Sequence, residues 1–378
     1  MKFAAIIGKQ SVKKNLINTV KTGRVSHAQL FHSQTGSGAL ALAIAYAQYI
    51  LCQNKQEDDS CGSCFSCKQI QNFSYPDLHF VYPIVKQESK PKEPVSADYL
   101  DEWKELMSSN IYFDPMQWST QMGAEKKLAS ISKFESDNIV KKLLLKSYSG
   151  FEKILIMWLP EKLNGTAANK LLKLIEEPPA KTFFILVSEN TEAVLQTITS
   201  RCQKTLIPSY SPTEITAHLV SELSVQESAA QVIATLSKGN LAQAIALGGD
   251  SQKYQNYSLH FRDWVRYCFK ADVKSIFKWV DESSKMDRDS SKDFLLFALN
   301  SFRDALQANL GLTDGNSALF NRASFSLKDF SKYTHLANIP KILELLSEAS
   351  YEIERNGNPK IIYSDVSFKL ANLLRITF

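Results

Sequence analysis

Four of the six cysteines lie close together near the start of the chain. Their pattern is Cys52-x8-Cys61-x2-Cys64-x2-Cys67, and the last three form the run CGSCFSC. Four thiolates on a short loop suit a tetrahedral Zn²⁺ site without an open position, which is a structural site. Iron–sulfur proteins also use C-x2-C-x2-C runs, but their fourth cysteine usually follows just downstream, and residues 68–76 contain none. We therefore favour structural zinc, with an iron–sulfur cluster or unliganded thiols as alternatives.

A glycine-rich stretch at 30–42, LFHSQTGSGALAL, has the outline of a phosphate-binding loop. A working loop reads G-x-x-x-x-G-K-[ST], in which the Lys binds the β- and γ-phosphates and the hydroxyl holds Mg²⁺. Here the turn keeps two glycines but lacks the Lys and the hydroxyl, and its residues are Ser33, Gly36, Gly38, Ala39 and Leu40. Taken alone, the stretch fits a plain strand–turn–helix or a nucleotide-binding fold that has lost its nucleotide.

Size and composition set broad limits on the class of protein. The chain has 378 residues, of which 44% are hydrophobic and 22% are charged, so two or three globular domains are expected. The formal net charge of +5 permits contact with nucleic acid without requiring it. No apolar run approaches the length of a membrane span, and the N-terminal apolar stretch is too short for a secretory signal. We therefore expect a cytoplasmic protein without membrane contact.

The hydrophobic pattern predicts an α/β doubly wound domain with a parallel sheet over residues 1–207. Helical periodicity alternates with short apolar runs, which is typical of this architecture. The expected helices cover 7–27, 39–51, 132–146 and 167–179, and the expected strands cover 29–31, 78–83, 153–159 and 181–190. In the helix of 132–146 we expect Ile139, Leu143 and Leu144 to face inward. The zinc module occupies 52–67, and residues 84–130 form an insertion, expected to be a surface elaboration on this domain.

The rest of the chain is expected to be helical. Residues 208–249 predict a small helical lid domain, in which Gly239 ends a helix. Residues 250–378 predict a third, all-α domain, with helices near 253–270, 273–285, 290–310, 325–333, 338–356 and 363–376.

Several of these motifs together resemble the bacterial DNA polymerase III clamp-loader subunits, an AAA+ family. HAQLF, the GSG turn and the helix after it resemble the loop that opens the fold. The cysteine spacing resembles the zinc module of the family in both pattern and place. AANKLLKLIEEPP resembles the helix after the second acidic motif, and FFILVSENTEAVLQTITSRCQ resembles the sensor strand with its Ser-Arg-Cys motif. The resemblance is strong over about 1–50, 52–80 and 150–248, covers the insertion poorly, and is limited to helical character in the last third.

The family contains motor subunits that hydrolyse ATP and a delta-prime kind that does not. Alignment with the family places Trp158 and Leu159 where motor subunits carry acidic residues, and Glu161 follows two residues late. Ala242 stands where an Arg often senses the γ-phosphate. Together with Ala39 and Leu40, these positions have lost the charges that phosphoryl transfer needs. The resemblance therefore implies a delta-prime-type subunit without ATP hydrolysis.

The resemblance also assigns functional roles to individual residues. Arg201, in Ser200-Arg201-Cys202, corresponds to an arginine finger that reaches the γ-phosphate bound by a neighbouring subunit. Helix N-termini that track DNA phosphates in the family correspond here to Lys133, Asn164, Gly165 and Thr166. The implied partners are gamma/tau-type and delta-type subunits in a ring, the sliding clamp and primer-template DNA. Residues 250–378 would form a collar, or an independent helical domain.

Two other functions stay open on the sequence. The first is an ATP-hydrolysing gamma/tau-type clamp-loader subunit, which would need the missing charges. The second is a zinc-containing nucleic-acid-binding or regulatory protein outside a clamp loader, which would not join such a ring.

Overall fold

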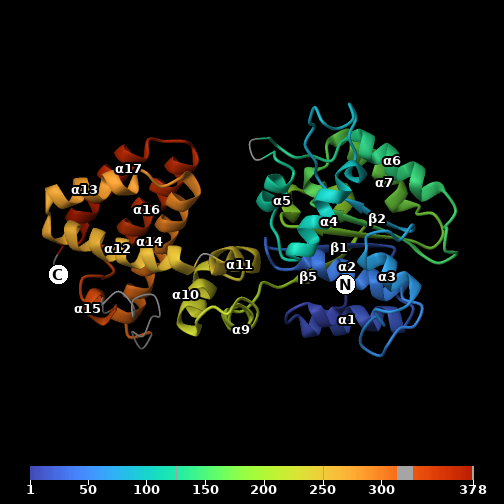
Figure 1. Ribbon diagram of the computed structural model, residues 1–378, viewed down its shortest axis with the longest axis horizontal. Helices are drawn as coiled ribbons and strands as arrows, with labels where there is room; N and C mark the ends of the chain where they lie inside the picture. The colour runs from blue at the N-terminus through green and yellow to red at the C-terminus, as the bar shows by residue number, and fades with distance from the viewer. Residues whose placement is uncertain (125–126, 250, 313–326, 377–378) are drawn as a thin grey trace. The chain divides into compact units, whose positions relative to one another are not determined.

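The computed structural model describes residues 1–124, 127–249, 251–312 and 327–376. Its chain divides into two compact units (Figure 1). The first unit consists of Met1–Glu214 with the short segment Gly239–Gln243, and the second consists of Ile215–Lys238 with Ala244–Phe378. The segment of 239–243 therefore returns to the first unit from within the helical part of the sequence. The predicted domain boundaries at 207 and 249 stay predictions.

A five-stranded parallel sheet lies at the centre of the first unit (Figure 1). Its order is β2-β3-β4-β1-β5, and every neighbouring pair is parallel. The strands are β1 (Ala28–Ser33), β2 (Leu78–Val81), β3 (Lys153–Trp158), β4 (Thr182–Ser188) and β5 (Gln203–Ile207). The predicted α/β fold class is confirmed.

Helices cover both faces of this sheet because successive strand residues point to opposite faces. Ile154, Ile156 and Trp158 of β3 enter one apolar cluster, whereas Leu155 and Met157 enter the other. The helices of the unit are α1 (Gln10–Lys21), α2 (Ala39–Leu51), α3 (Phe65–Gln71), α4 (Leu100–Ser109), α5 (Pro115–Gln121), α6 (Lys133–Leu144), α7 (Gly165–Glu176) and α8 (Gln196–Thr199). Residues of α1, α2, α4 and α5 pack in the first cluster, and residues of α6 and α7 pack in the second. Short 3₁₀ turns occupy Phe3–Ala5, Ser96–Tyr99, Pro160–Lys162 and Thr191–Ala193.

The insertion packs on the first domain, as expected, and it reaches further into the core than a surface elaboration would. Trp103 of α4 and Trp118 of α5 are fully buried and belong to the same apolar cluster as β3. Trp103 stacks on Tyr82, with ring centroids 4.0 Å apart, and also packs on Trp158. Because large aromatic side chains bury much apolar area, this segment folds inward onto the sheet.

Helix α6 confirms two of its three predicted inward residues. Ile139 and Leu143 are buried, but 66% of Leu144 is exposed. The α-helix ends at Leu144, and Leu145 turns into extended backbone. Since the helical period places Leu143 on the buried face, its neighbour one residue later points away from that face. The prediction for Leu144 was therefore wrong.

The second unit is helical throughout the residues described. Its helices are the end of α9 (Pro212–Leu223), α10 (Glu227–Ser237), most of α11 (Leu241–Gly249), α12 (Ser251–Lys270), α13 (Val273–Ser283), α14 (Arg288–Asn309), α15 (Leu327–Ser331), α16 (Ile339–Glu354) and α17 (Pro359–Leu373). Trp264 stacks on Trp279 with centroids 4.7 Å apart, and its indole N–H donates to Ser367 Oγ at 2.8 Å. The first two residues of the predicted helix at 325–333 lie outside the described residues. Within the described part of the chain, no helix combines the length and apolar character needed to cross a bilayer.

Candidate functional site

The four clustered cysteines meet at one point beside the C-terminal end of α2. All four Sγ atoms lie within 4.8 Å of one another. Cys52 Sγ is 3.6 Å from Cys61 Sγ and 4.0 Å from Cys64 Sγ, and Cys61 Sγ is 3.9 Å from Cys67 Sγ. A tetrahedron of sulfurs at the usual Zn–S distance has edges of about 3.8 Å. The four thiols therefore fit a tetrahedral metal ion and could hold one.

Local backbone geometry prepares these sulfurs to bind a cation. The N–H of Cys61 donates to Cys52 Sγ, and the N–H of Cys64 donates to Cys61 Sγ, both at 3.3 Å. Hydrogen bonds from the backbone N–H groups of Ser63 and Cys64 lower the pKa of Cys61 from 9.0 to about 6. Burial instead raises the pKa of Cys52 and of Cys67, so these donors favour the thiolate, which is the metal-binding form, at Cys61 and not at all four sulfurs.

The glycine-rich loop connects β1 to α2, as predicted, and contains two left-handed residues. Gly36 has φ +71°, and Gly38, at the N-cap of α2, has φ +77°. Ala39 and Leu40 form the first turn of the helix and are buried. Ser33 ends β1 and contacts the main chain of β4 through Ser188 O. The loop thus has the position and turn of a phosphate loop, without a cation or a metal-binding hydroxyl at 39 and 40.

The space in front of this loop is filled by the protein itself. About 20 Å³ remains among the loop, Ile111, Tyr112, Phe113, Trp158, Val187 and Glu189. This volume holds roughly one water molecule. A Cβ on Gly38 would lie 3.0 Å from the Tyr112 ring, and one on Gly36 would collide with the side chain of Asn240. Side chains of the chain itself therefore crowd the space in front of the loop.

The end of β3 contains none of the acidic residues that a metal–phosphate site needs. Trp158 and Leu159 are buried, and Leu159 adopts φ +58°. Glu161 Oε1 accepts hydrogen bonds from the backbone N–H groups of Glu189 and Asn190, at 3.0 and 3.1 Å. Glu161 therefore holds the turn after β4. Ala242, at the position aligned with the γ-phosphate sensor, is buried, and its backbone N approaches Gly36.

A carboxyl group that the sequence did not suggest stands beside the loop. Glu189 Oε2 accepts a hydrogen bond from Thr35 Oγ1 at 2.8 Å. Burial, with smaller contributions from the charges of Glu161 and Asp114, raises the pKa of Glu189 from 4.5 to about 7. Negative charge at this place would repel phosphate.

A Glu189→Gln variant is expected to have a larger free energy of unfolding than the wild type above neutral pH. The protonated carboxyl is favoured in the folded state, so the free energy of unfolding of the wild type falls as pH rises from about 4.5 to about 7. The amide of the variant does not titrate, so the variant should be more stable by about 3 kcal/mol at pH 8 and nearly equal at pH 4.5. Urea unfolding across this pH range measures the difference in free energy of unfolding. Glu192→Gln, at an exposed position, is the control and should show no such pH dependence. A constant difference at all pH values would contradict the assignment.

Arg201 lies on the surface just after α8. Its guanidinium Nη2 is 2.5 Å from Glu176 Oε1, and its Nη1 donates to Thr197 O at 2.8 Å. The Arg201 side chain is 38% exposed, and that of Glu176 is 43% exposed. An exposed ion pair of this kind contributes only about 0–1 kcal/mol. The ion pair thus positions the guanidinium but costs little to break. Cys202, the next residue, is buried.

The tertiary structure brings the predicted phosphate contacts side by side. Ile131 and Leu163 form a parallel bridge, so α6 and α7 begin next to each other. Lys133 is the first residue of α6, and Asn164 caps α7 by accepting from Ala167 N at 2.7 Å. Gly165 and Thr166 form the exposed first turn of α7. Two helix N-termini, one of which begins with Lys133, therefore lie side by side, and each carries partial positive charge.

Sequence reasoning missed the residues that fill the loop. Tyr112 and Phe113 lie in the insertion, which the resemblance covers poorly, and Asn240 lies beyond the α/β domain. The only available signal was the density of aromatic residues in the insertion, which indicates burial without saying where.

The sheet order, the loop from β1 to α2 and the helical part that follows define an α/β protein with a parallel sheet and an all-helical second part. The family model described as "DNA polymerase III, delta subunit" matches residues 8–211, which is more than half of the chain. The chain belongs to this family.

Known relatives include both kinds of subunit. The chain is 31% identical to the DNA polymerase III subunit delta' of Yersinia pestis over 191 residues, which cover 50% of this chain and 44% of that one. It is 25% identical to the delta' subunit of Bacillus subtilis (strain 168) over 356 residues, which cover 92% and 91% of the two chains. It is 20% identical to subunit tau of B. subtilis over 397 residues, which cover 98% of this chain and 61% of tau.

Proposed function

We propose that this chain is the non-hydrolysing, delta-prime-type subunit of a DNA polymerase III clamp-loader complex. The observation that carries this proposal is the glycine loop, where aromatic and acidic side chains leave only about 20 Å³. Loss of Lys and hydroxyl at Ala39 and Leu40 and of carboxylates at Trp158 and Leu159 supports the same conclusion, because phosphoryl transfer depends on those charges. The chain would be a component of the DNA-directed DNA polymerase complex without ATPase activity of its own.

In the assembled complex this subunit would act on ATP only through Arg201. The surface position of Arg201 and its weak, exposed ion pair suit a side chain that reaches into a neighbouring subunit. A guanidinium is always charged and forks to two phosphate oxygens. The neighbour would be a gamma/tau-type subunit, and a delta-type subunit would complete the ring. The complex would open the sliding clamp and load it onto primer-template DNA.

The remaining parts would serve positioning and assembly. Zinc held by the four cysteines would fix the loop of 52–67 and supply no chemistry, since four protein ligands leave no open position. Residues 208–249 would form a lid domain and residues 250–378 a collar that joins the other subunits. Lys133 and the start of α7 at Asn164, Gly165 and Thr166 would contact DNA phosphates. Such contacts predict binding that ignores sequence and weakens steeply with salt.

One mixing experiment tests this function. The purified chain is expected to show no ATP hydrolysis alone, to join gamma/tau-type and delta-type subunits in size-exclusion chromatography, and to raise the DNA-dependent ATPase of the mixture. Hydrolysis by the chain alone would favour a motor subunit. Failure to co-elute with either subunit would favour a zinc-containing protein outside a clamp loader.

A further inference from the structure

The insertion places three consecutive residues against the glycine-rich loop that resembles a phosphate-binding loop. Ile111, Tyr112 and Phe113 all line the small remaining space there. Only 5% of Tyr112 and 6% of Phe113 is exposed. Phe113 meets Trp158 edge to face, with ring centroids 5.2 Å apart, at the end of β3 where the acidic residues are missing. The chain itself therefore occupies the volume in front of the loop.

Tyr112 connects segments that are distant in sequence. Its hydroxyl accepts a hydrogen bond from the backbone N–H of Ile7 at 3.0 Å. Its ring meets Tyr210 edge to face, with centroids 6.0 Å apart, and lies against the backbone of Gly38. One side chain thus touches the N-terminal segment, the glycine loop and the segment after β5.

The two segments that follow the α/β domain are tied to the same place. The N–H of Leu241 donates to Gly36 O at 3.0 Å, and the N–H of Tyr210 donates to Gly239 O at 3.2 Å. Ser209 Oγ donates to Gln34 Oε1 at 2.8 Å. Residues 209–214 and 239–243 are thereby closed over the loop within the first unit.

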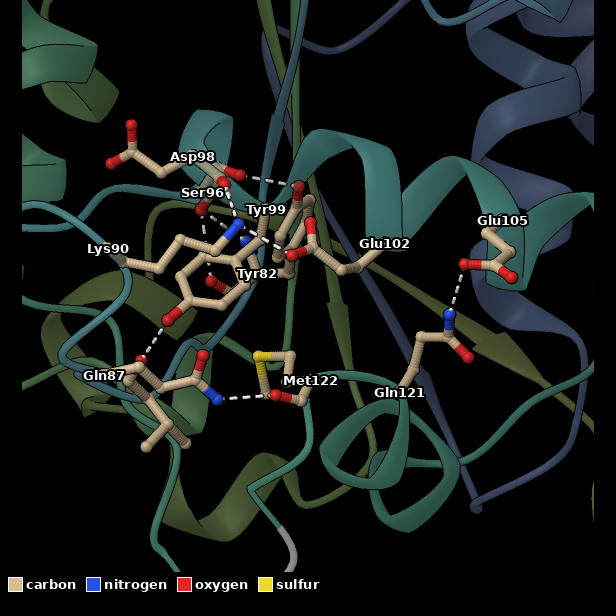
Figure 2. Close-up of polar contacts among 11 residues, drawn as sticks. Tyr82, Gln87, Lys90, Ser96, Asp98, Tyr99, Glu102, Glu105, Gln121 and Met122 are labelled. Atoms are coloured by element: carbon tan, nitrogen blue, oxygen red, sulfur yellow. Dashed lines mark hydrogen bonds and ion pairs between the residues drawn. The ribbon is translucent and has the colours of Figure 1, made fainter.

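Hydrogen bonds within the insertion and to the segment after β2 give Tyr112 a fixed position. Asn110 Oδ1 accepts from Tyr112 N and Asn110 Nδ2 donates to Tyr112 O, both at 2.8 Å, so the turn before the ring is fixed. Lys90 binds Glu102 at 2.6 Å and also donates to Asp98 O at 2.6 Å (Figure 2). The Trp118 indole N–H donates to Pro83 O at 2.8 Å. The first two sets of contacts stabilise the insertion internally, and the Trp118 bond ties it to the chain just after β2.

We propose that residues 111–113 are an intramolecular substitute for a nucleotide. They fill the loop and keep 209–214 and 239–243 closed onto the α/β domain, so that the first unit keeps one closed arrangement with no ligand. The insertion accordingly makes the subunit permanently rigid at this place. This inference concerns the chain alone and does not depend on its partners.

Hydrogen exchange of three backbone amides tests the proposal. The reporters are the N–H groups of Ile7, Tyr210 and Leu241, whose acceptors are Tyr112 Oη, Gly239 O and Gly36 O. In Tyr112→Ala all three should exchange at least about 10-fold faster, while β3 and the cysteine loop stay unchanged. Met116→Ala, at an exposed position of the same insertion, should change none of them. Unchanged reporters, or an equal acceleration throughout the first unit, would overturn the proposal.

A conservative variant keeps the test valid if Tyr112→Ala does not fold. Tyr112→Phe removes only the hydroxyl, so the Ile7 amide should exchange several-fold faster while Tyr210 and Leu241 stay protected. Because the ring still fills the space in front of the loop in Tyr112→Phe, an equally faster exchange of the Tyr210 and Leu241 amides would overturn the proposal.

Discussion

An Arg201→Ala variant, placed in the reconstituted complex, is expected to lower ATP hydrolysis about a thousand-fold at the neighbouring nucleotide site while the complex still assembles. Arginine fingers contribute factors of about 10³ to 10⁵ to phosphoryl transfer because they stabilise charge in the transition state. Assembly should persist because the exposed pair with Glu176 contributes only about 0–1 kcal/mol to the fold. Single-turnover hydrolysis with the other sites inactivated is the measurement, since steady-state rates average over all sites.

Two matched variants separate the finger from the ion pair. Arg201→Lys keeps the charge but loses the fork, so its rate should stay close to that of Arg201→Ala. Glu176→Gln releases Arg201 from its surface partner without removing the guanidinium, so hydrolysis should stay close to the wild-type rate. Full activity of Arg201→Ala in a complex of normal composition would refute the finger role. Equal losses in Arg201→Ala and Glu176→Gln would instead assign the effect to the surface pair.

A Cys67→Ser variant is expected to lose bound zinc and to unfold at a temperature lower by about 10 °C. Structural zinc contributes folding free energy directly, and a serine hydroxyl replaces a thiolate poorly as a zinc ligand. Cys67 is fully buried in α3, which packs against α2. A loss of several kcal/mol corresponds to a shift of this size in a domain of this length. Metal content by mass spectrometry and thermal unfolding are the measurements.

The other cysteines provide the control for this prediction. Cys202 is buried in the same unit but lies outside the cluster, so Cys202→Ser should keep one zinc per chain and cost much less stability. The loop should also become accessible to protease in Cys67→Ser, together with the N-terminal segment, because Asp59 in that loop accepts from the N–H groups of Phe3 and Ala4. A wild-type protein without metal, or a Cys67→Ser variant with a full complement, would contradict the assignment.

The sequence by itself determined the features that depend on short-range order. The four cysteines span 16 residues, so their spacing alone brought the sulfurs within reach of one ion. The alternation of apolar runs with helical periodicity predicted the parallel sheet, because central strands such as β3 are buried on both faces and helices such as α6 are buried on one. The missing charges at Ala39, Leu40, Trp158 and Leu159 were visible as residue types. Even so, the prediction placed Leu144 inward beside Leu143, although neighbouring positions of an α-helix point about 100° apart.

Only the tertiary structure decided what occupies the glycine loop. Tyr112 comes from an insertion more than seventy positions after Gly38, Glu189 follows a strand that pairs with β1, and Asn240 returns from among the helices. The pKa of Glu189 is raised by burial that none of its sequence neighbours indicates. Such contacts join chain segments that are brought together by packing of the whole core. Local residue patterns therefore do not predict them. The sequence could therefore show that the loop had lost its phosphate chemistry, and the folded chain shows that the same space is filled by its own side chains.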